Sequence, residues 1–299
     1  SGTLSLGGFT DTVGSFSITD GEFASGTLTA ATYSLGGGLV SGNLGAGAAS
    51  VSSGSTTLSG TSAATTLLID GGTLVLGNNA RIDNATAVTI SSGTLNISNN
   101  TDTVGSLVMS GGVLEGAGTV TAGAYGLNGG TVNANLGAGT VTASSGTTDL
   151  NGTLAGNLNV SGATLNLGSS DRLNDSSTLS VSGGTLAMGT SSDTVASVSI
   201  SGGSITGSGT LTSSSYAVSA GTASVVLAGA ATLTKNGAGT VTLEAGNTYS
   251  GGTTLSQGTL VLDNSSALGS GSVSAVDGKI LANDGLNVSN TISVSAGGT

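Results

Sequence analysis

The chain has 299 residues, a formal charge of −11, and no Cys, His, Pro or Trp. Only four residues are basic, so the surface is expected to repel nucleic acid and anionic membranes, and neither is a predicted partner. Without His or Cys the chain cannot form a Ser-His-Asp triad, a Cys-His pair, or a metal site with imidazole or thiolate ligands. No apolar run reaches the roughly 18 residues of a membrane-spanning helix, so direct insertion of this segment into a membrane is not predicted.

The composition favours a thin aliphatic core. Apolar residues make up 36% of the chain, aromatic residues only 2%, and there are 55 glycines. Compact globular cores usually fill volume with aromatic rings, whereas stacked repeats bury Val, Leu, Ile and Ala against their neighbours. Intrinsic disorder is the alternative for a chain so rich in Gly, Ser and Thr. The positive mean hydropathy of +0.33 and the regular strand patterning favour an ordered fold.

A long internal repeat runs through most of the chain. The motif Asp-Thr-Val-Gly-Ser at Asp11 recurs at Asp102, and Asp-Thr-Val-Ala-Ser follows at Asp193, each time after 91 residues. Three tyrosines follow these aspartates at a nearly constant distance along the chain: Tyr33, Tyr125 and Tyr216. Such self-similarity is typical of repeat architectures. The predicted boundaries of the long repeats are about 1–92, 93–183 and 184–232.

A shorter rhythm lies within each long repeat. Gly-Thr-Leu and Gly-Thr-Val triplets recur, most of them spaced by about 20 residues, beginning at Gly72, Gly93, Gly118, Gly139, Gly184, Gly209, Gly239 and Gly258. Around them, small polar and apolar residues alternate, which is the pattern of a half-buried strand. The spacing suits one coil of a β-helix and is too short for a propeller blade of roughly 40 residues. The sequence therefore predicts an all-β fold, one continuous parallel β-helix of about 14 coils over residues 1–299.

Residues 233–273 carry the most specific motif. It consists of Leu233-Thr-Lys235, Gly237-Ala-Gly-Thr-Val241, Asn247-Thr-Tyr249, Gly251-Gly-Thr-Thr254, Gly258-Thr-Leu-Val261 and Ala267-Leu-Gly269. This order and spacing resemble the autotransporter-associated β-strand repeat of large bacterial surface proteins. The resemblance implies a right-handed parallel β-helix passenger, displayed outside the cell and attached to the outer membrane through a region outside this sequence. It implies no particular ligand. Residues 274–299 are predicted to add further coil.

Both ends of the sequence fall within the repeat pattern. Gly2-Thr-Leu4 precedes Asp11 by nine residues, as the equivalent triplets precede Asp102 and Asp193, so the chain begins in mid-repeat. It stops in mid-pattern at Ser295-Ala-Gly-Gly-Thr299, and neither end shows a polar cap. We therefore expect a segment of a longer protein, or a unit that stacks end to end on copies of itself. The predicted partners are neighbouring coils of the parent chain or other copies.

The recurring aspartates Asp11, Asp102 and Asp193 are the main polar candidates. As a functional site they would form a row along one face that makes weak calcium or sugar contacts. The alternative is that each carboxylate caps a turn ahead of its Thr-Val strand through hydrogen bonds to the backbone. The spacing favours this alternative, because calcium prefers about six to eight oxygen ligands and each repeat supplies one carboxylate. No metal site and no cofactor is predicted.

The recurring tyrosines Tyr33, Tyr125 and Tyr216 are the second candidate. They would form an aromatic stripe for sugars, or each ring would fill a wide corner of its coil and keep the hydroxyl in water. Charged residues also recur, as Arg81 with Asp83 and as Arg172 with its acidic neighbours. These are interpreted as corner salt bridges, not as the acid–base groove of a polysaccharide lyase or hydrolase.

These observations predict a non-catalytic, structural protein, with no catalytic residues. The expected function is a rigid extracellular stalk or adhesin-like passenger segment of a large bacterial surface protein, for which surface glycans or host cell-surface proteins are further candidate partners. A self-assembling extracellular filament or sheath unit is an alternative that the uncapped ends favour. A β-helix carbohydrate-active enzyme is a second alternative, which would require a groove with several carboxylates and a base.

Overall fold

The computed structural model describes residues 2–295, and this part of the chain contains strands, turns and bends but no helix. The fold is a parallel β-solenoid of about 16 turns, which confirms the predicted fold class. The handedness of the coil stays a prediction. The number of turns exceeds the predicted value of about 14 because several coils are short. The coil that leads from Asp11 to its aligned partner Leu28, for example, is shorter than the coil that leads from Ile69 to Ile90.

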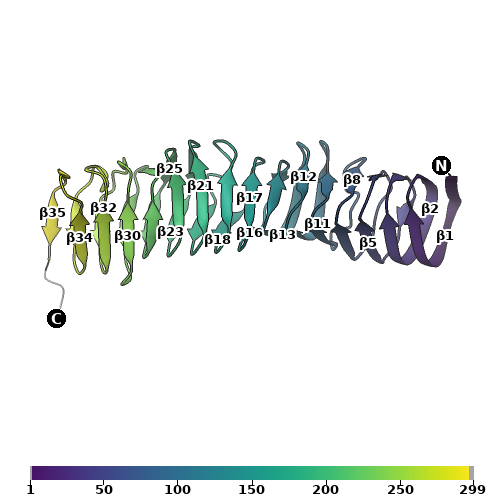
Figure 1. The fold of residues 1–299 in the computed structure, drawn as a ribbon, viewed down its shortest axis with the longest axis horizontal. Coiled ribbons are helices and arrows are strands. Elements are labelled where there is room, and N and C mark those ends of the chain that lie inside the picture. Colours follow the sequence, from purple (N-terminus) through teal and green to yellow (C-terminus); the bar gives the residue numbers. More distant parts are fainter. Residues whose placement is uncertain (1, 296–299) are drawn as a thin grey trace. The chain divides into compact units, whose positions relative to one another are not determined.

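The chain divides into two compact units, and within each of them parallel strands lie side by side (Figure 1). The first unit comprises Ser1–Val141 and Thr148–Gly156. Its strands are β1 (Gly2–Ile18), β2 (Gly21–Leu35), β3 (Gly38–Val40), β4 (Asn43–Leu44), β5 (Ala48–Val51), β6 (Ser55–Leu58), β7 (Thr66–Ile69), β8 (Thr73–Leu76), β9 (Ala87–Ile90), β10 (Thr94–Asn96), β11 (Thr101–Met109), β12 (Val113–Glu115), β13 (Thr119–Leu127), β14 (Gly130–Val132) and β15 (Asn135–Leu136). The chain passes between the units at β16 (Thr140–Ala143) and β17 (Thr147–Leu150).

The second unit comprises Thr142–Thr147 and Asn157–Thr299. Its strands are β18 (Asn157–Val160), β19 (Thr164–Leu167), β20 (Thr178–Val181), β21 (Thr185–Gly189), β22 (Asp193–Val195), β23 (Ser197–Ile200), β24 (Ser204–Gly207), β25 (Thr210–Ser213), β26 (Ser215–Val218), β27 (Gly221–Ala223), β28 (Val226–Ala228), β29 (Thr232–Lys235), β30 (Thr240–Leu243), β31 (Thr253–Leu255), β32 (Thr259–Leu262), β33 (Val273–Ala275), β34 (Lys279–Ala282) and β35 (Ile292–Val294). Residues 296–299, the end of the predicted last coil, lie outside the described residues. That the two units form one continuous solenoid stays a prediction.

The core of each unit is a set of aliphatic columns. On strands such as β7 and β9, successive side chains point alternately into the core of the coil and towards solvent, as the period-2 pattern predicts. In the first unit Ile69, Ile90 and Met109 occupy equivalent positions on three successive coils and are fully buried. Because the strands are parallel and in register, each buried side chain packs on its equivalents in the coils before and after it.

The backbone of an interior strand forms hydrogen bonds with a neighbouring strand on each side. β9, for example, pairs in parallel with β7 on one side and with β11 on the other. Proline would remove a hydrogen-bond donor from such a strand, which gives its absence a physical reason. The described residues include no helix long and apolar enough to cross a membrane.

Candidate functional site

The clearest polar site of the first unit lies where the start of β11 meets the turn at residues 80–82. Asp102 Oδ2 accepts hydrogen bonds from the backbone N–H groups of Arg81 (2.8 Å) and Ile82 (3.1 Å). The N–H of Ala80 donates to the carbonyl oxygen of Thr101 at 2.9 Å. Ala80 has φ of 51°, a left-handed conformation that helps successive N–H groups to converge on an anion. The turn is therefore a small anion-binding concavity, and the next coil supplies its carboxylate.

The second unit repeats this arrangement independently. Asp193 Oδ2 accepts from the N–H groups of Arg172 (2.9 Å) and Leu173 (3.0 Å). Asp171, with φ of 57°, donates its N–H to the carbonyl oxygen of Ser192 at 3.1 Å. Three backbone N–H donors, an aspartate Oδ2 and a carbonyl oxygen as acceptors, and one residue with a left-handed backbone therefore recur at equivalent positions. We call each arrangement an aspartate clamp, formed by the turn 80–82 with Asp102 or by the turn 171–173 with Asp193.

The carboxylates of Asp102 and Asp193 both bind backbone N–H groups, and most of these donors differ from the ones predicted. We expected each aspartate to cap the turn ahead of its own Thr-Val strand. Asp193 Oδ1 does accept a hydrogen bond from the N–H of Thr194 at 2.9 Å, but Oδ2 of both aspartates binds the turn of the preceding coil. The residues that supply the N–H groups were missed. A signal was present, because Arg81 and Arg172 recur at the interval of the long repeat and each lies 21 residues before its aspartate.

The three aspartates do not form a row of equivalent surface groups. Asp102 and Asp193 are each only 3% exposed, whereas Asp11 is exposed on β1. Asp11 Oδ1 accepts a hydrogen bond from the N–H of Thr12 at 2.7 Å, within its own strand. Among the described residues, no group of three or more acidic side chains converges as a metal site would require. Asp102 and Asp193 therefore bind the preceding coil, and of the three aspartates only Asp11 faces solvent.

Burial has the largest effect on the pKa of the carboxyl group in both clamps. It raises the pKa of Asp102, against the opposing effects of the N–H donors and the nearby Arg81 charge. It also raises the pKa of Asp193, where the N–H donors again oppose it and the negative charge of Asp171 adds to the rise. A carboxyl whose native pKa is raised binds its proton more tightly in the folded chain than in the unfolded chain.

This difference predicts that the clamps make the protein more stable in mild acid than at neutral pH. Between the ordinary aspartate pKa of 3.8 and the raised native values, the folded state holds more protons, so stability falls as the pH rises through that window. We expect urea midpoints to decrease from pH 4 towards pH 7. In the variant Asp102→Asn/Asp193→Asn this slope should become smaller, while Asp20→Asn, at an exposed turn, should leave it unchanged. Equal slopes in all three proteins would contradict the prediction.

The corner salt bridge predicted for Arg81 and Asp83 is absent. Arg81 Nε donates to the carbonyl oxygen of Asn79, and one terminal nitrogen donates to that of Ser59, both at 2.8 Å. Asp83 Oδ1 accepts instead from the N–H of Ala85 at 2.8 Å. The arginine therefore ties its own turn to the preceding coil through backbone oxygens at a corner where the ladder is interrupted.

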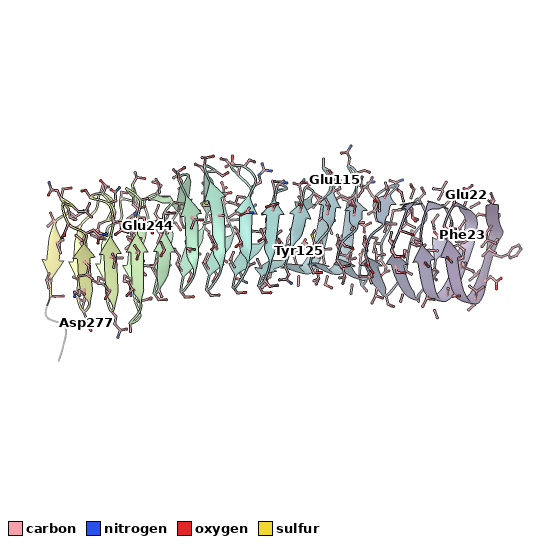
Figure 2. All side chains as sticks on the ribbon, viewed as in Figure 1. Glu22, Phe23, Glu115, Tyr125, Glu244 and Asp277 are labelled. Atoms are coloured by element: carbon pink, nitrogen blue, oxygen red, sulfur yellow. The ribbon has the colours of Figure 1, made fainter. Side chains whose placement is uncertain are left out.

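The recurring tyrosines lie inside the coils, not on a surface stripe. Figure 2 labels Tyr125 among the strands of the first unit, where it is 2% exposed. Its hydroxyl accepts from the N–H of Ala122 (2.8 Å) and donates towards the carbonyl oxygens of Val120 (3.0 Å) and Gly137 (3.3 Å). Tyr33 makes the equivalent three contacts one long repeat earlier. Burial raises the pKa of both phenols.

Tyr216 is the third member of this set, and its hydroxyl contacts the carbonyl oxygens of Leu211 (2.6 Å) and Ala228 (2.8 Å). Its burial leaves no ring face for a sugar, as for the other two. The three rings are buried on strands β2, β13 and β26, and that they fill wide corners stays a prediction. Their hydroxyls bond to backbone groups, where water was expected, because a buried phenol needs a hydrogen-bond partner.

A buried lysine marks the region 233–273 in the second unit. Lys235, at the end of β29, is fully buried. Its ammonium donates to the carbonyl oxygens of Asn236 (3.1 Å), Gly237 (2.6 Å) and Gln257 (3.0 Å). Burial lowers its pKa. Three acceptors match the three protons of an ammonium group, so the lysine holds a turn of its own coil to the next coil.

Two further motif residues complete this region. Asn247 accepts from the N–H of Leu227 (2.8 Å) and donates to the carbonyl oxygen of Ala267 (2.6 Å), so it joins the preceding coil to the following one. Tyr249 shares a hydrogen bond with the Thr253 hydroxyl (2.7 Å), and burial raises its pKa to about 12. Lys235 and Asn247 therefore bind coil to coil, as the aspartate clamps do, whereas the contact of Tyr249 lies within its own coil.

Comparison with known proteins identifies this region. Residues 233–262 match the family model described as Passenger-associated-transport-repeat. No curated protein and no solved structure matches the chain. The matched segment contains Lys235, Asn247 and Tyr249, the residues whose contacts are given above. Such a repeat belongs to autotransporter passengers and implies a secreted or surface-exposed passenger. The second unit of this chain therefore contains a passenger-associated transport repeat at residues 233–262.

Proposed function

We propose that this chain is a structural, non-catalytic part of an autotransporter-type passenger and serves as a stalk outside the bacterial cell. The observation that carries the proposal is the use of polar side chains. Asp102, Asp193, Lys235 and Asn247 all bind backbone groups of neighbouring coils. Polar groups committed to coil-to-coil contacts are not available for substrate, so the chemistry of the chain supports stacking.

Mechanical and proteolytic resistance would follow from this arrangement. Parallel strand pairings join successive coils throughout each unit. Opening one coil would break both of its ladders and expose its aliphatic side chains together, so local opening is expected to be rare. A passenger outside the cell meets proteases and shear, against which such cooperativity protects.

Digestion with elastase, which cleaves after small aliphatic residues, tests the proposal. We expect a core that resists cleavage at least a hundredfold longer than the urea-unfolded chain. The same preparation should show no depolymerisation of a panel of bacterial and host polysaccharides. Rapid digestion under native conditions would contradict the stalk, and depolymerisation of any polysaccharide would favour the enzyme alternative.

A filament or sheath unit is kept as a second candidate because outer strands carry exposed apolar side chains. On β1 these include Leu4 and Phe9, and on β35 they include Ile292 and Val294. Open strand edges of this kind can pair with other chains. Sedimentation velocity over a concentration series, with negative-stain microscopy, separates the two functions: fibres that lengthen with concentration support the filament, and a monomer at all concentrations supports the stalk.

A further inference from the structure

Asparagine begins eight Asn-x-Ser/Thr triplets, the acceptor pattern of N-linked glycosylation, and all of them lie within the described residues. In a chain so rich in Ser and Thr, the pattern alone selects no site. The structure separates the triplets, because a bulky sugar requires an asparagine that faces solvent. In the triplet Asn174–Ser176 alone, all three residues are exposed. The eight triplets start at Asn84, Asn96, Asn99, Asn151, Asn159, Asn174, Asn264 and Asn287.

Asn174 begins a tight turn in the second unit, between β19 and β20. Its carbonyl oxygen accepts a hydrogen bond from the N–H of Ser177 at 2.9 Å. Its side-chain Oδ1 accepts from the N–H of Ser176, also at 2.9 Å, and from the Ser176 hydroxyl. The side-chain Nδ2 has no hydrogen-bond partner among the residues that the structure describes, so the nitrogen that a sugar would modify is free.

The first unit forms the same turn with different chemistry. Asp83, one long repeat before Asn174, accepts from the N–H of Ala85 through Oδ1 at 2.8 Å and from that of Thr86 through its carbonyl oxygen at 3.0 Å. A carboxylate has no N–H group to carry a sugar. The triplet here starts one residue later, at Asn84, and its Thr86 hydroxyl is buried and donates to a carbonyl oxygen of the preceding coil at 2.6 Å. Triplet and turn therefore coincide only in the second unit.

This turn supports the chemistry of glycosyl transfer. An amide nitrogen is a weak nucleophile because its lone pair is delocalised into the carbonyl group. When Nδ2 attacks the anomeric carbon of a nucleoside-diphosphate sugar, it forms a C–N bond and gives up one proton to a base of the transferring enzyme. The bond from the anomeric carbon to the diphosphate oxygen breaks, and the nucleoside diphosphate leaves with the electron pair. Negative charge develops on Oδ1, where the two donors of Ser176 stabilise it.

We infer that Asn174 is an acceptor for an N-linked sugar, transferred from a nucleoside-diphosphate sugar by a glycosyltransferase that recognises Asn-x-Ser. The Ser176 hydroxyl and N–H hold the amide for the transfer. Because the turn lies between strands and all its contacts given above are within residues 174–177, a sugar here leaves the strand pairing intact. Charged residues make up only 6% of the chain, so a hydrophilic sugar also adds solubility. The site is independent of the stalk function.

The test uses the purified full chain, uridine-diphosphate glucose and a soluble N-glycosyltransferase specific for Asn-x-Ser/Thr. A short acceptor peptide with the same triplet establishes that the enzyme is active. Peptide mass spectrometry then measures the fraction of each asparagine that carries a hexose. We expect this fraction to be at least tenfold higher at Asn174 than at Asn84. An unmodified Asn174, or equal modification of Asn84, would overturn the inference.

Variants based on the turn of the first unit isolate the two contributing residues. Asn174→Asp should abolish the modification and Ser176→Ala should reduce it at least tenfold; both proteins are expected to fold, because Asp83 and Ala85 occupy these positions in the first unit. Ser176→Thr should restore the modification. Asp83→Asn/Ala85→Ser places the triplet on the turn of the first unit, and position 83 should gain a hexose. Full modification in Ser176→Ala, or no gain at position 83, would overturn the roles assigned to Ser176 and to the turn.

Discussion

Gly118→Ala is expected to destabilise the first unit by about 3 kcal/mol or more, although it adds a single methyl group. Gly118 lies just before β13 and has an ordinary φ, so backbone strain is not the reason. A Cβ at this position would collide with the backbone of Asn100 in the preceding coil, including its carbonyl oxygen. The carbonyl oxygen of Asn100 already accepts a hydrogen bond from the N–H of Thr119 at 3.1 Å, so these backbone atoms cannot move aside as a flexible side chain can, and the coils would have to separate locally.

Gly123→Ala is the matched control, because it lies within β13 only five residues further on. The nearest atom to a Cβ there is the carbonyl oxygen of Gly105 at 3.6 Å, an ordinary contact. This substitution should be neutral or stabilising by about 0.5 kcal/mol, because alanine restricts the unfolded chain. Urea unfolding of the two variants measures the difference. Equal midpoints would mean that coil spacing at Gly118 tolerates a side chain, against the close stacking described above.

The alternation of small polar and apolar residues was sufficient to predict the coils and their cores. Thr66–Ile69 and Ala87–Ile90 show why: a shift of one residue would turn every buried side chain outward, so the pattern fixes the register. The number of coils was less predictable. Corners differ in length by several residues, and nothing in the composition of a Gly- and Ser-rich corner states how many residues it holds.

The clamps could not be predicted from the sequence in the same way. An aspartate that recurs at a fixed distance after an arginine shows that something repeats, but the contact is between the carboxylate and the backbone N–H groups of Arg81 and Ile82. The recurrence of the arginine marks the repeat, but its side chain does not show that the backbone N–H of the same residue is the donor. Ala80 and Asp171 adopt the same left-handed conformation with different side chains, so the turn itself also lacks a residue signal.

The contacts of the buried tyrosines were missed for a related reason. The regular interval identified Tyr125 as a repeated feature, and the structure places it on strand β13 with its ring buried. Whether its hydroxyl meets water or backbone depends on where the bend leaves unsatisfied groups, here the N–H of Ala122 and the carbonyl of Val120. These groups become available only when the chain is coiled. The sequence therefore identified the recurring aspartates and tyrosines but neither their hydrogen-bond partners nor the roles of Lys235 and Asn247.

Lys235→Met should destabilise the second unit by about 2–4 kcal/mol. Two effects oppose each other. Removal of the charge abolishes the desolvation cost of a fully buried ammonium, which favours the variant. The same substitution leaves the carbonyl oxygens of Asn236, Gly237 and Gln257 without their donor, at a cost of about 1–3 kcal/mol for each one that water cannot reach. Because the cost of three carbonyl oxygens without a donor exceeds the gain from removing one desolvated charge, we expect the variant to be less stable.

The pH dependence provides an independent measure of the same lysine. Burial lowers the native pKa of Lys235 below the ordinary value of 10.5, so the unfolded chain holds the extra proton between the two values. Stability contributed at this site therefore rises with pH through that window, and the rise should be absent in Lys235→Met. Lys279→Met, at an exposed position on β34, is the control and should change neither the stability nor the slope. A Lys235→Met protein that is as stable as the parent, with the parent's slope, would show that the ammonium does not hold the passenger-associated transport repeat to its neighbouring coil.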